Sequence, residues 1–361
     1  MFSTLVQASN LDQRQFELKN IQSQITRQQS TLQNTTKHRK KLQSLLKKDE
    51  QAIAHVAKKL NTTQNDLKII DKQLKTIKVK QSELNGQREH QQQTLSKQLE
   101  SAYLSGNHDY TKMLLNQQNP ATVERMLVYY QYLNDARVTA ITNLKNTIEE
   151  LDSLSQQESQ RKLELTQLML AQQNQVKQLN KEQVQRERTL NQLKRTLTSK
   201  SAQLEQLQIE EASIKQLIEK ALLEAKNNPK MDGLRHGNKK LSWPTEGKIV
   251  EQFGSGRAGG IKWKGVIISA PEGNNIRAIA SGKVIYADWL KGFGMVIVLD
   301  HGKGYMSLYG HAQALLKPVG AKIKTGEAIA LVGRSGGQAN PGLYFEIRHK
   351  GQAVNPTIYC R

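Results

Sequence analysis

The chain has 361 residues, which suggests two or three domains. Its formal net charge of +21 divides into +10 for residues 1–228 (34 − 24), +3 for 229–242 (4 − 1) and +8 for 243–361 (15 − 7). The excess charge is spread, and no zinc-finger spacing, RNP-like run or concentrated basic arm occurs, so nucleic-acid binding is disfavoured. Solvated helix faces explain this charge best, followed by an anionic envelope or partner. No run of 18 apolar residues predicts a membrane-spanning helix, and the single cysteine, Cys360, excludes an internal disulfide.

Composition divides the chain near residue 228. Of its 24 glycines, 22 lie after that point, together with all three tryptophans, whereas Gln, Lys, Leu and Glu dominate before it. A helical segment followed by a compact domain is therefore predicted. Residues 1–9, MFSTLVQAS, have two interpretations: the end of a secretory signal peptide with a small-residue site near Ala8, or a frayed terminus.

Residues 10–228 carry a heptad pattern that predicts a coiled coil, because apolar residues recur at alternating steps of three and four. One seam position holds Leu11, Leu18, Ile25, Leu32, Leu46, Ile53, Leu60, Leu67, Leu74 and Leu95, and the other holds Ile21, Leu42, Val56, Ile70, Ile77 and Leu84.

A second helical stretch is predicted after Asn119-Pro120, where proline suits a helix start. Its seam holds Leu144, Ile148, Leu151, Leu190, Leu193, Leu197, Leu204, Leu207, Ile214 and Ile218. A break near 104–121 favours an antiparallel hairpin over an extended parallel dimer, since a dimer would gain nothing from Gly106, Asn107 and Pro120.

The predicted hairpin tip is rich in aromatic residues, because all five tyrosines of the helical part fall within 103–132. Two interpretations stay open: a small local core and a docking patch, in which Tyr and Met are common. The candidate docking residues are Tyr103, Leu104, Met113, Leu114, Met126, Tyr129 and Tyr130.

The last helical stretch, IKQLIEKALLEAKNN (214–228), is amphipathic and could pack on the coiled coil or on the next domain. We interpret it as a candidate regulatory helix. Residues 229–242 are predicted to form a polar linker.

From Trp243 the apolar pattern changes to period two, with glycine-containing turns at short intervals, which predicts a small all-β domain of antiparallel hairpins. The predicted strands are KIVEQF, VIISA, NIRAIA, GKVIYADW, GMVIVLDH, GYMSLYGH, KIKTG, EAIALVG and GLYFEIRH.

Several ordered blocks in residues 243–361 resemble the LytM (peptidase family M23) domain. They are GIKWKGVIISAPEGNNIRAIASGKVIYADW, GKGYMSLYGHA, KIKTGEAIALVGRSGG and PGLYFEIRHKGQAVNP. The preceding coiled coil and the WKG, SLYG and LYFEIR segments are similar to the EnvC-type murein hydrolase activators. The resemblance implies an α + β multidomain protein, with a long antiparallel coiled-coil hairpin followed by a small all-β LytM/M23-type domain.

Enzymes of this family hold zinc with an H-x-G-x-D block and the second histidine of an H-x-H block, and a zinc-bound water acts as nucleophile. The resemblance places Trp263, Ile267 and Tyr344 at these ligand positions and Gly342 at the first histidine of H-x-H. Only the histidine of the Y-x-H block remains, as His311. His301 and His349 lack partners at metal spacing and are expected in a turn or on the surface. The resemblance therefore implies a degenerate domain without metal, cofactor or hydrolase activity.

The resemblance further implies a non-catalytic activator of periplasmic N-acetylmuramoyl-L-alanine amidases, acting at the division septum under the FtsE–FtsX complex. The amidase would lie in the former substrate groove, and peptidoglycan is a further candidate ligand. The predicted amidase contacts are Lys264, Ile267, Phe293, Tyr309, His311, Tyr344 and Arg348, and the tip residues would contact the periplasmic domain of FtsX. A peptidoglycan-binding tether and an active zinc endopeptidase are the alternatives.

Overall fold

The computed structural model describes residues 5–105, 120–197, 200–225, 233–234, 241–256 and 262–361. Its long helices are α1 (Leu5–Ser105), α3 (Pro120–Arg195) and α4 (Lys200–Ala225). Residues 5–9 of the predicted leader remnant lie within α1. The chain forms two compact units, one made of Met1–Asn61 and Gln175–Arg361 and the other of Thr62–Asn174. None of the described helices is apolar over a stretch long enough to cross a membrane.

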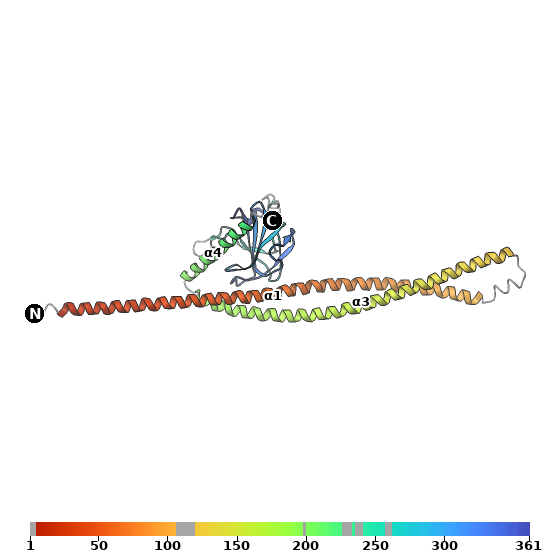
Figure 1. The fold of residues 1–361 in the computed structure, drawn as a ribbon, viewed down its shortest axis with the longest axis horizontal. Coiled ribbons are helices and arrows are strands. Elements are labelled where there is room, and N and C mark those ends of the chain that lie inside the picture. Colours follow the sequence, from red (N-terminus) through yellow and green to blue (C-terminus); the bar gives the residue numbers. More distant parts are fainter. Residues whose placement is uncertain (1–4, 106–119, 198–199, 226–232, 235–240, 257–261) are drawn as a thin grey trace. The chain divides into compact units, whose positions relative to one another are not determined.

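Helices α1 and α3 pair antiparallel within each unit (Figure 1). In the first unit Nε of Arg186 lies 3.2 Å from Oε1 of Glu50, and in the second Nζ of Lys80 lies 2.5 Å from Oε1 of Glu150. Within the first unit Asp49 contacts Thr189 and Glu50 contacts Arg186, so the residue number falls along α3 as it rises along α1. Most of the predicted tip, 106–119, lies outside the described residues.

The α1 seam is largely as predicted, and the α3 seam is as predicted in part, since Leu190 and Leu193 are buried against Leu42 and Leu46. The predicted positions Leu42, Leu46, Ile53, Ile70, Leu74 and Leu84 are buried. Ile148, however, is 47% exposed, and Leu154 is buried in its place. A 3.6-residue helix drifts against a heptad frame, so a seam extended over many turns loses register. Side chains at Leu11, Leu18, Ile21, Ile25 and Leu32 lie outside the described part.

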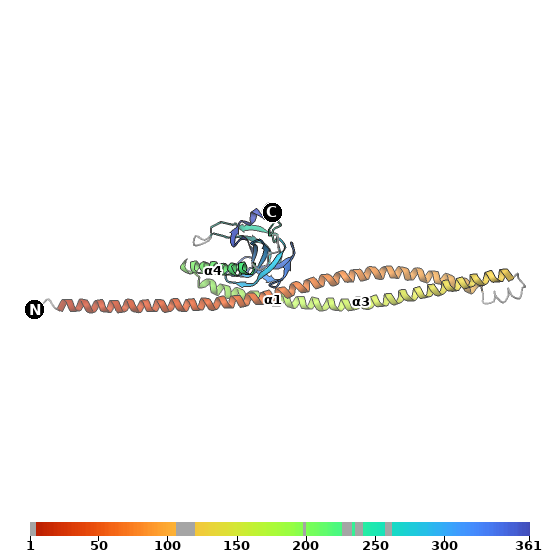
Figure 2. The ribbon, with the colours of Figure 1, turned by 45° about the horizontal axis from the view of Figure 1, so that its top comes forward.

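The prediction that one helix continues past residue 195 is wrong. α3 ends at Arg195, and the backbone N–H groups of Thr196 and Leu197 close its last turn onto Leu193 and Lys194. α4 then packs on the sheet of the C-terminal domain, against β4 and β5, rather than extending the coiled-coil seam (Figure 2). Leu204, predicted as a seam residue, is 40% exposed.

The C-terminal domain is an antiparallel β structure, as the period-two pattern predicted. Its strands are β1 (Lys248–Glu251), β2 (Val266–Ser269), β3 (Asn275–Arg277), β4 (Gly282–Leu290), β5 (Gly294–Gly302), β6 (Tyr305–Leu315), β7 (Lys322–Ile323), β8 (Ala328–Val332), β9 (Gly342–His349) and β10 (Gln352–Val354). The main sheet has the order β1-β2-β9-β6-β5-β4-β7, with β10 on β9, and β8 joining β3 to β6. β10 and a 3₁₀ turn at Pro356–Ile358 were not predicted.

The predicted linker, residues 229–242, is partly packed against this domain. Leu234 is buried, and the Gly233 N–H donates to the carbonyl of His301 at 2.9 Å. Leu241 forms a bridge with Cys360 near the end of the chain. The core of the domain therefore includes Leu234 and Leu241, which polar composition had assigned to the linker.

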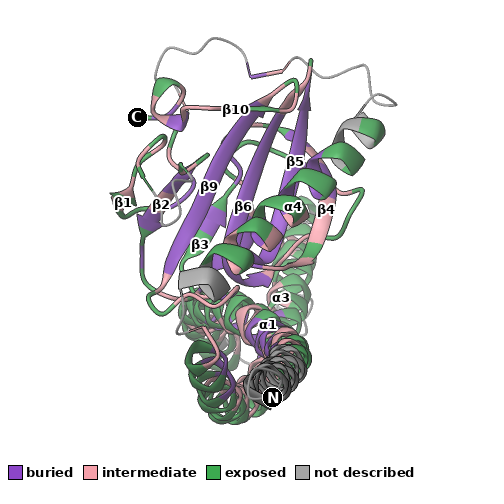
Figure 3. Ribbon diagram, turned by 90° about the vertical axis from the view of Figure 1, so that its left-hand side faces the viewer, coloured by how far each residue is buried: buried purple, intermediate pink, exposed green. Residues whose placement is uncertain are grey.

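The central strands bury side chains on both faces (Figure 3). Successive residues of a strand point to opposite faces. On β5, Ile297 and Leu299 join the core formed within the domain, whereas Val296 and Val298 join a second core that α4 completes. Burying a Val, Leu or Ile side chain stabilises a protein by about 1.5–3 kcal/mol. The face under α4 therefore needs a cover.

His301 is buried, contrary to the expected turn or surface position. It is 1% exposed, its Nδ1 lies 2.8 Å from the carbonyl oxygen of Ser281, and its Nε2 lies 2.7 Å from the Ser307 hydroxyl. Burial lowers the pKa of His301 from 6.5 to about 4, because the imidazolium would lose its hydration. The imidazole is therefore neutral at pH 7.

We predict that His301 makes the folded chain less stable as the pH falls. The unfolded chain takes up this proton near pH 6.5 and the folded chain only near pH 4, so stability falls between these values. From pH 7 to pH 5 the contribution is a loss of about 2 kcal/mol. Chemical denaturation of the whole chain and of His301→Gln at both pH values measures it. Equal losses in the two proteins would contradict the prediction.

Candidate functional site

The three positions that the resemblance equates with zinc ligands lie together. Ile267 of β2 pairs directly with Tyr344 of β9, and the ring centroids of Trp263 and Tyr344 are 6.1 Å apart. The backbone of Trp263 pairs with residues 254–255: its carbonyl accepts from the Gly254 N–H at 2.8 Å, and its N–H donates to the Ser255 carbonyl at 3.0 Å. An indole and an aliphatic side chain carry no metal-ligating atom, so these residues do not fit zinc.

Phe293 and His311 complete the surface beside Tyr344. The Phe293 ring stacks on the His311 imidazole, with centroids 6.2 Å apart, and lies 5.1 Å from the Tyr344 ring. His311 has a positive φ of 60°, a conformation held by its N–H, which donates to the Phe293 carbonyl at 2.7 Å. Its Nδ1 lies 2.8 Å from the Ser335 carbonyl. A carbonyl only accepts, so the ring proton is on Nδ1. We call the surface formed by Trp263, Ile267, Phe293, His311 and Tyr344 the groove.

A buried carboxylate organises the polar end of the groove. Glu346 is fully buried, and it accepts from the Tyr344 hydroxyl and from Arg348 Nε, both at 2.6 Å. Burial raises the pKa of Glu346, and the adjacent Arg348 opposes that shift. Arg348 Nη1 also donates to the Gly351 carbonyl at 2.8 Å. Two predicted contact residues are thus held by one carboxylate.

Helix α4 lies on one face of the sheet (Figure 3), where it covers the groove. Its apolar residues Ile214, Leu217 and Ile218 are each 4% exposed and share one core with Phe293 and Tyr344. The cover is close: a residual cavity of about 30 Å³ remains between helix and groove.

Two contacts of its acidic residues hold α4 at the groove rim. A Cβ atom on Gly292 would come within 2.1 Å of Cγ of Glu210, so only glycine permits this approach. Glu211 pairs with Lys264 at 2.8 Å, and this ion pair lowers the pKa of the Glu211 carboxyl. The predicted contact Lys264 therefore serves α4 in this structure.

Not every predicted contact residue lines the groove. Tyr309 is fully buried in the core formed within the domain, where it packs on Phe345 and its hydroxyl accepts from the Ile279 N–H. The strand pattern explains this placement, because Tyr309 and His311 are separated by a bulge where β6 pairs with β5.

The predicted tip residues are exposed where the structure describes them. Tyr103 is 86%, Leu104 77%, Tyr129 63% and Tyr130 40% exposed, and Met126 is half-buried. Met113 and Leu114 lie outside the described residues.

Sequence reasoning missed several residues that shape the site. Glu346 had a local signal, since it alternates with Tyr344 and Arg348 on a strand that is otherwise apolar. Ser335 had none: its hydroxyl accepts from the Met295 N–H at 2.8 Å and donates to the Ala312 carbonyl at 2.7 Å.

Metal-ligating side chains do not gather here. Across the part of the chain that the structure describes, no three or more His, Cys, Asp or Glu residues are placed to hold a metal ion.

Comparison with known proteins agrees with the geometry of the fold. Residues 261–356 match Peptidase family M23. The chain is 33% identical over 384 residues to the murein hydrolase activator EnvC of Escherichia coli, covering 97% of this chain and 91% of the relative. It is 42% identical over 118 residues to the E. coli murein hydrolase activator NlpD, covering 32% of this chain and 30% of that protein.

Among solved structures, Helicobacter pylori Csd3 is 25% identical over 34% of this chain and 35% of its own, with a TM-score of 0.30. The full-length similarity, spanning the helical part and the β domain, decides the assignment. The chain belongs to the EnvC family of murein hydrolase activators and carries a C-terminal domain of peptidase family M23.

Proposed function

We propose that this protein is a non-catalytic activator of periplasmic N-acetylmuramoyl-L-alanine amidases and promotes the splitting of septal peptidoglycan. The groove binds an amphipathic helix of the amidase, and that contact draws an inhibitory segment away from the amidase's zinc. The similarity to EnvC and NlpD, which are both murein hydrolase activators, supports this proposal.

One observation carries the proposal: the groove accommodates a helix. The apolar face of α4, with Ile214, Leu217 and Ile218, buries the groove residues Phe293 and Tyr344. A surface that fits one amphipathic helix so closely has the shape and polarity to bind another. In this proposal the groove binds a partner and does not catalyse hydrolysis, because Trp263, Ile267 and Tyr344 stand at the positions of the metal ligands.

α4 is then an intramolecular competitor of the amidase. An exposed surface of this apolar character would be an aggregation hazard, and α4 protects it. The amidase gains access only when α4 leaves the groove. The protein therefore has a closed form, in which α4 is bound, and an open form that activates.

In our proposal the FtsE–FtsX complex controls the departure of α4 from the groove. The exposed Tyr103, Leu104, Tyr129 and Tyr130 offer aromatic area of the kind that interfaces use. The periplasmic domain of FtsX binds there, and movement of that complex is passed along α1 and α3 to the groove.

We predict that Ile214→Asp combined with Ile218→Asp increases amidase stimulation by at least about tenfold, because two buried charges remove α4 from the groove. Release of dye from labelled sacculi measures this in a mixture of purified activator and amidase. Leu223→Asp is the matched control, since Leu223 lies on the same helix and is 64% exposed.

Without amidase, neither protein should release dye, and neither should retain stoichiometric zinc. Zinc retention together with dye release by the activator alone would replace the proposal with a zinc endopeptidase. Binding to sacculi without any stimulation in the double variant would replace it with a tether.

We predict that Tyr344→Ala in the Ile214→Asp/Ile218→Asp background reduces the affinity for the amidase by about 10- to 100-fold, the usual range for an interface aromatic. Tyr344→Phe keeps the ring and loses only the hydrogen bond to Glu346, so it should retain most of the affinity. Calorimetric titration measures both, with circular dichroism to confirm folding. Equal affinities for the Ala and Phe variants would exclude Tyr344 as an amidase contact.

We predict that replacing Tyr103, Tyr129 and Tyr130 with serine weakens binding to the periplasmic domain of FtsX by at least about tenfold, because exposed aromatic area is lost. Pull-down with the purified domain measures it. Val184→Ser is the control, as Val184 is 50% exposed on α3 in the other compact unit. Unchanged binding would move the FtsX site elsewhere.

A further inference from the structure

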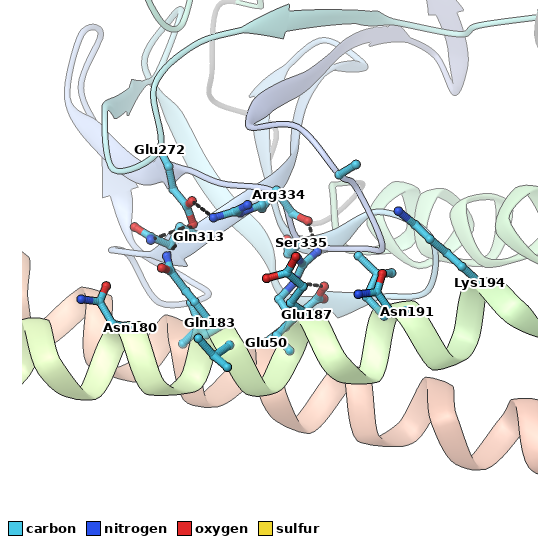
Figure 4. A pocket seen from close by; sticks show the side chains of 15 residues that line it. Glu50, Asn180, Gln183, Glu187, Asn191, Lys194, Glu272, Gln313, Arg334 and Ser335 are labelled. Carbon is cyan, nitrogen blue, oxygen red and sulfur yellow. Dashed lines mark hydrogen bonds and ion pairs between the residues drawn. The ribbon is translucent and has the colours of Figure 1, made fainter.

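A buried ionic cluster joins α1 and α3 to the β domain within one compact unit (Figure 4). Its centre is Glu50 of α1, which is 2% exposed, and Arg186 of α3, which is 6% exposed. A cavity of about 320 Å³ beside them is lined by α1, α3 and the loop after β8. We call Glu50, Arg186, Trp289 and the backbone of residues 334–338 the Glu50 cluster.

The Glu50 carboxylate accepts from three different elements. Arg186 Nε donates at 3.2 Å, the Trp289 Nε1 donates at 2.6 Å, and the Gly336 N–H lies 2.9 Å from both oxygens. Arg186 in turn donates through Nη2 to the carbonyls of Arg334 and Gln338. Each charge is therefore neutralised only while both helices and the domain stay together.

A partly separated state of this cluster is high in free energy. A buried carboxylate that loses one partner keeps its desolvation cost and loses the interaction that offsets it. Partial separation of the domain from the helices is thus disfavoured, and the contact opens as a unit, once water can reach both charges. Two discrete arrangements are what a switch requires.

The loop that receives Glu50 also supports the groove. Gly336 donates to Glu50, while its neighbour Ser335 holds His311 through its carbonyl and Met295 through its hydroxyl. A Cβ atom on Gly336 would come within 2.4 Å of the Gly294 nitrogen, so the loop packs directly on the strand beside Phe293. Glu50 therefore binds the residue next to Ser335, which itself contacts His311 of the groove.

The same part of α1 also holds α4. Arg39 pairs with Glu205 at 2.7 Å, and Gln43 Nε2 donates to the Gln206 side chain at 2.7 Å. Gln206 supports Glu210, the residue that sits on Gly292 at the groove rim. Residues 39–50 therefore contact both the helix that covers the groove and the loop beneath it.

We propose that the Glu50 cluster is a latch that keeps α4 in the groove, and that parting α1 from the β domain at this level releases α4. The proposal rests on the proposed function only in identifying the groove as the amidase site. Opening itself is a property of this chain and can be measured without any partner. A purely structural cluster would instead loosen only the loop at 333–338 when it is weakened.

Hydrogen exchange of the full chain, followed by mass spectrometry, tests the latch directly. We expect Glu50→Gln to accelerate exchange of the α4 amides by at least about tenfold while β5 and β6 stay protected, because local opening and global unfolding are separate events. Glu187→Gln is the matched control, since Glu187 is an exposed carboxylate on the next residue of α3 and lines the same cavity.

Trp289→Phe covers the case in which Glu50→Gln unfolds the chain. It removes the indole N–H that donates to Glu50, together with part of the ring's packing area, and keeps an aromatic ring in place. We expect the same acceleration in α4, smaller than in Glu50→Gln. The latch is overturned if α4 exchanges at the rate of the unmodified chain in the variants that stay folded, or if acceleration is confined to residues 333–338.

Amidase stimulation by the same variants separates this proposal from the previous one. Faster exchange in α4 with no stimulation, even by Ile214→Asp/Ile218→Asp, would leave the latch standing and reject amidase activation. Stimulation by Ile214→Asp/Ile218→Asp together with unchanged exchange in the Glu50→Gln chain would do the reverse.

Discussion

The packing of α4 on the groove is the interaction on which the rest of this structure depends. Ile214, Leu217 and Ile218 supply the missing half of a core whose other half is one face of β5, β6 and β9. A single sheet that is apolar on both faces cannot face water on either. α4 therefore contributes to the stability of the domain and covers Phe293 and Tyr344 of the groove.

Two buried glutamates give this arrangement its polar framework. Glu346 lies under the groove and fixes Tyr344 and Arg348, and Glu50 lies beside it and fixes Trp289 and the loop at Gly336. Each pairs with an arginine, and burial raises the pKa of each carboxyl. Buried pairs of this kind add little stability relative to apolar residues, but they penalise misplaced partners heavily. They favour one geometry over its neighbours.

The position of α4 between the helices and the sheet explains why its residues have two sets of contacts. Its apolar face lies on the groove, while Glu205 and Gln206 contact α1. A change in the contacts of α4 with α1 therefore affects its packing on the groove, and the reverse also holds. In the sequence this helix follows directly after α3.

The sequence by itself determined the elements that repeat locally. Heptad spacing predicted the α1 seam, and period two predicted most strands. The resemblance to peptidase family M23 implied that Trp263, Ile267 and Tyr344 would meet. Only the tertiary structure decided that α3 stops at Arg195, that Tyr309 and His301 are buried in the domain, and that Glu50 meets Arg186 and Trp289 across 136 and 239 residues. Backbone periodicity is a property of neighbouring residues and is written in their order. Which apolar face covers which, and whether a charge finds its partner, depends on desolvation and packing between segments far apart in the chain, and no local pattern encodes that choice.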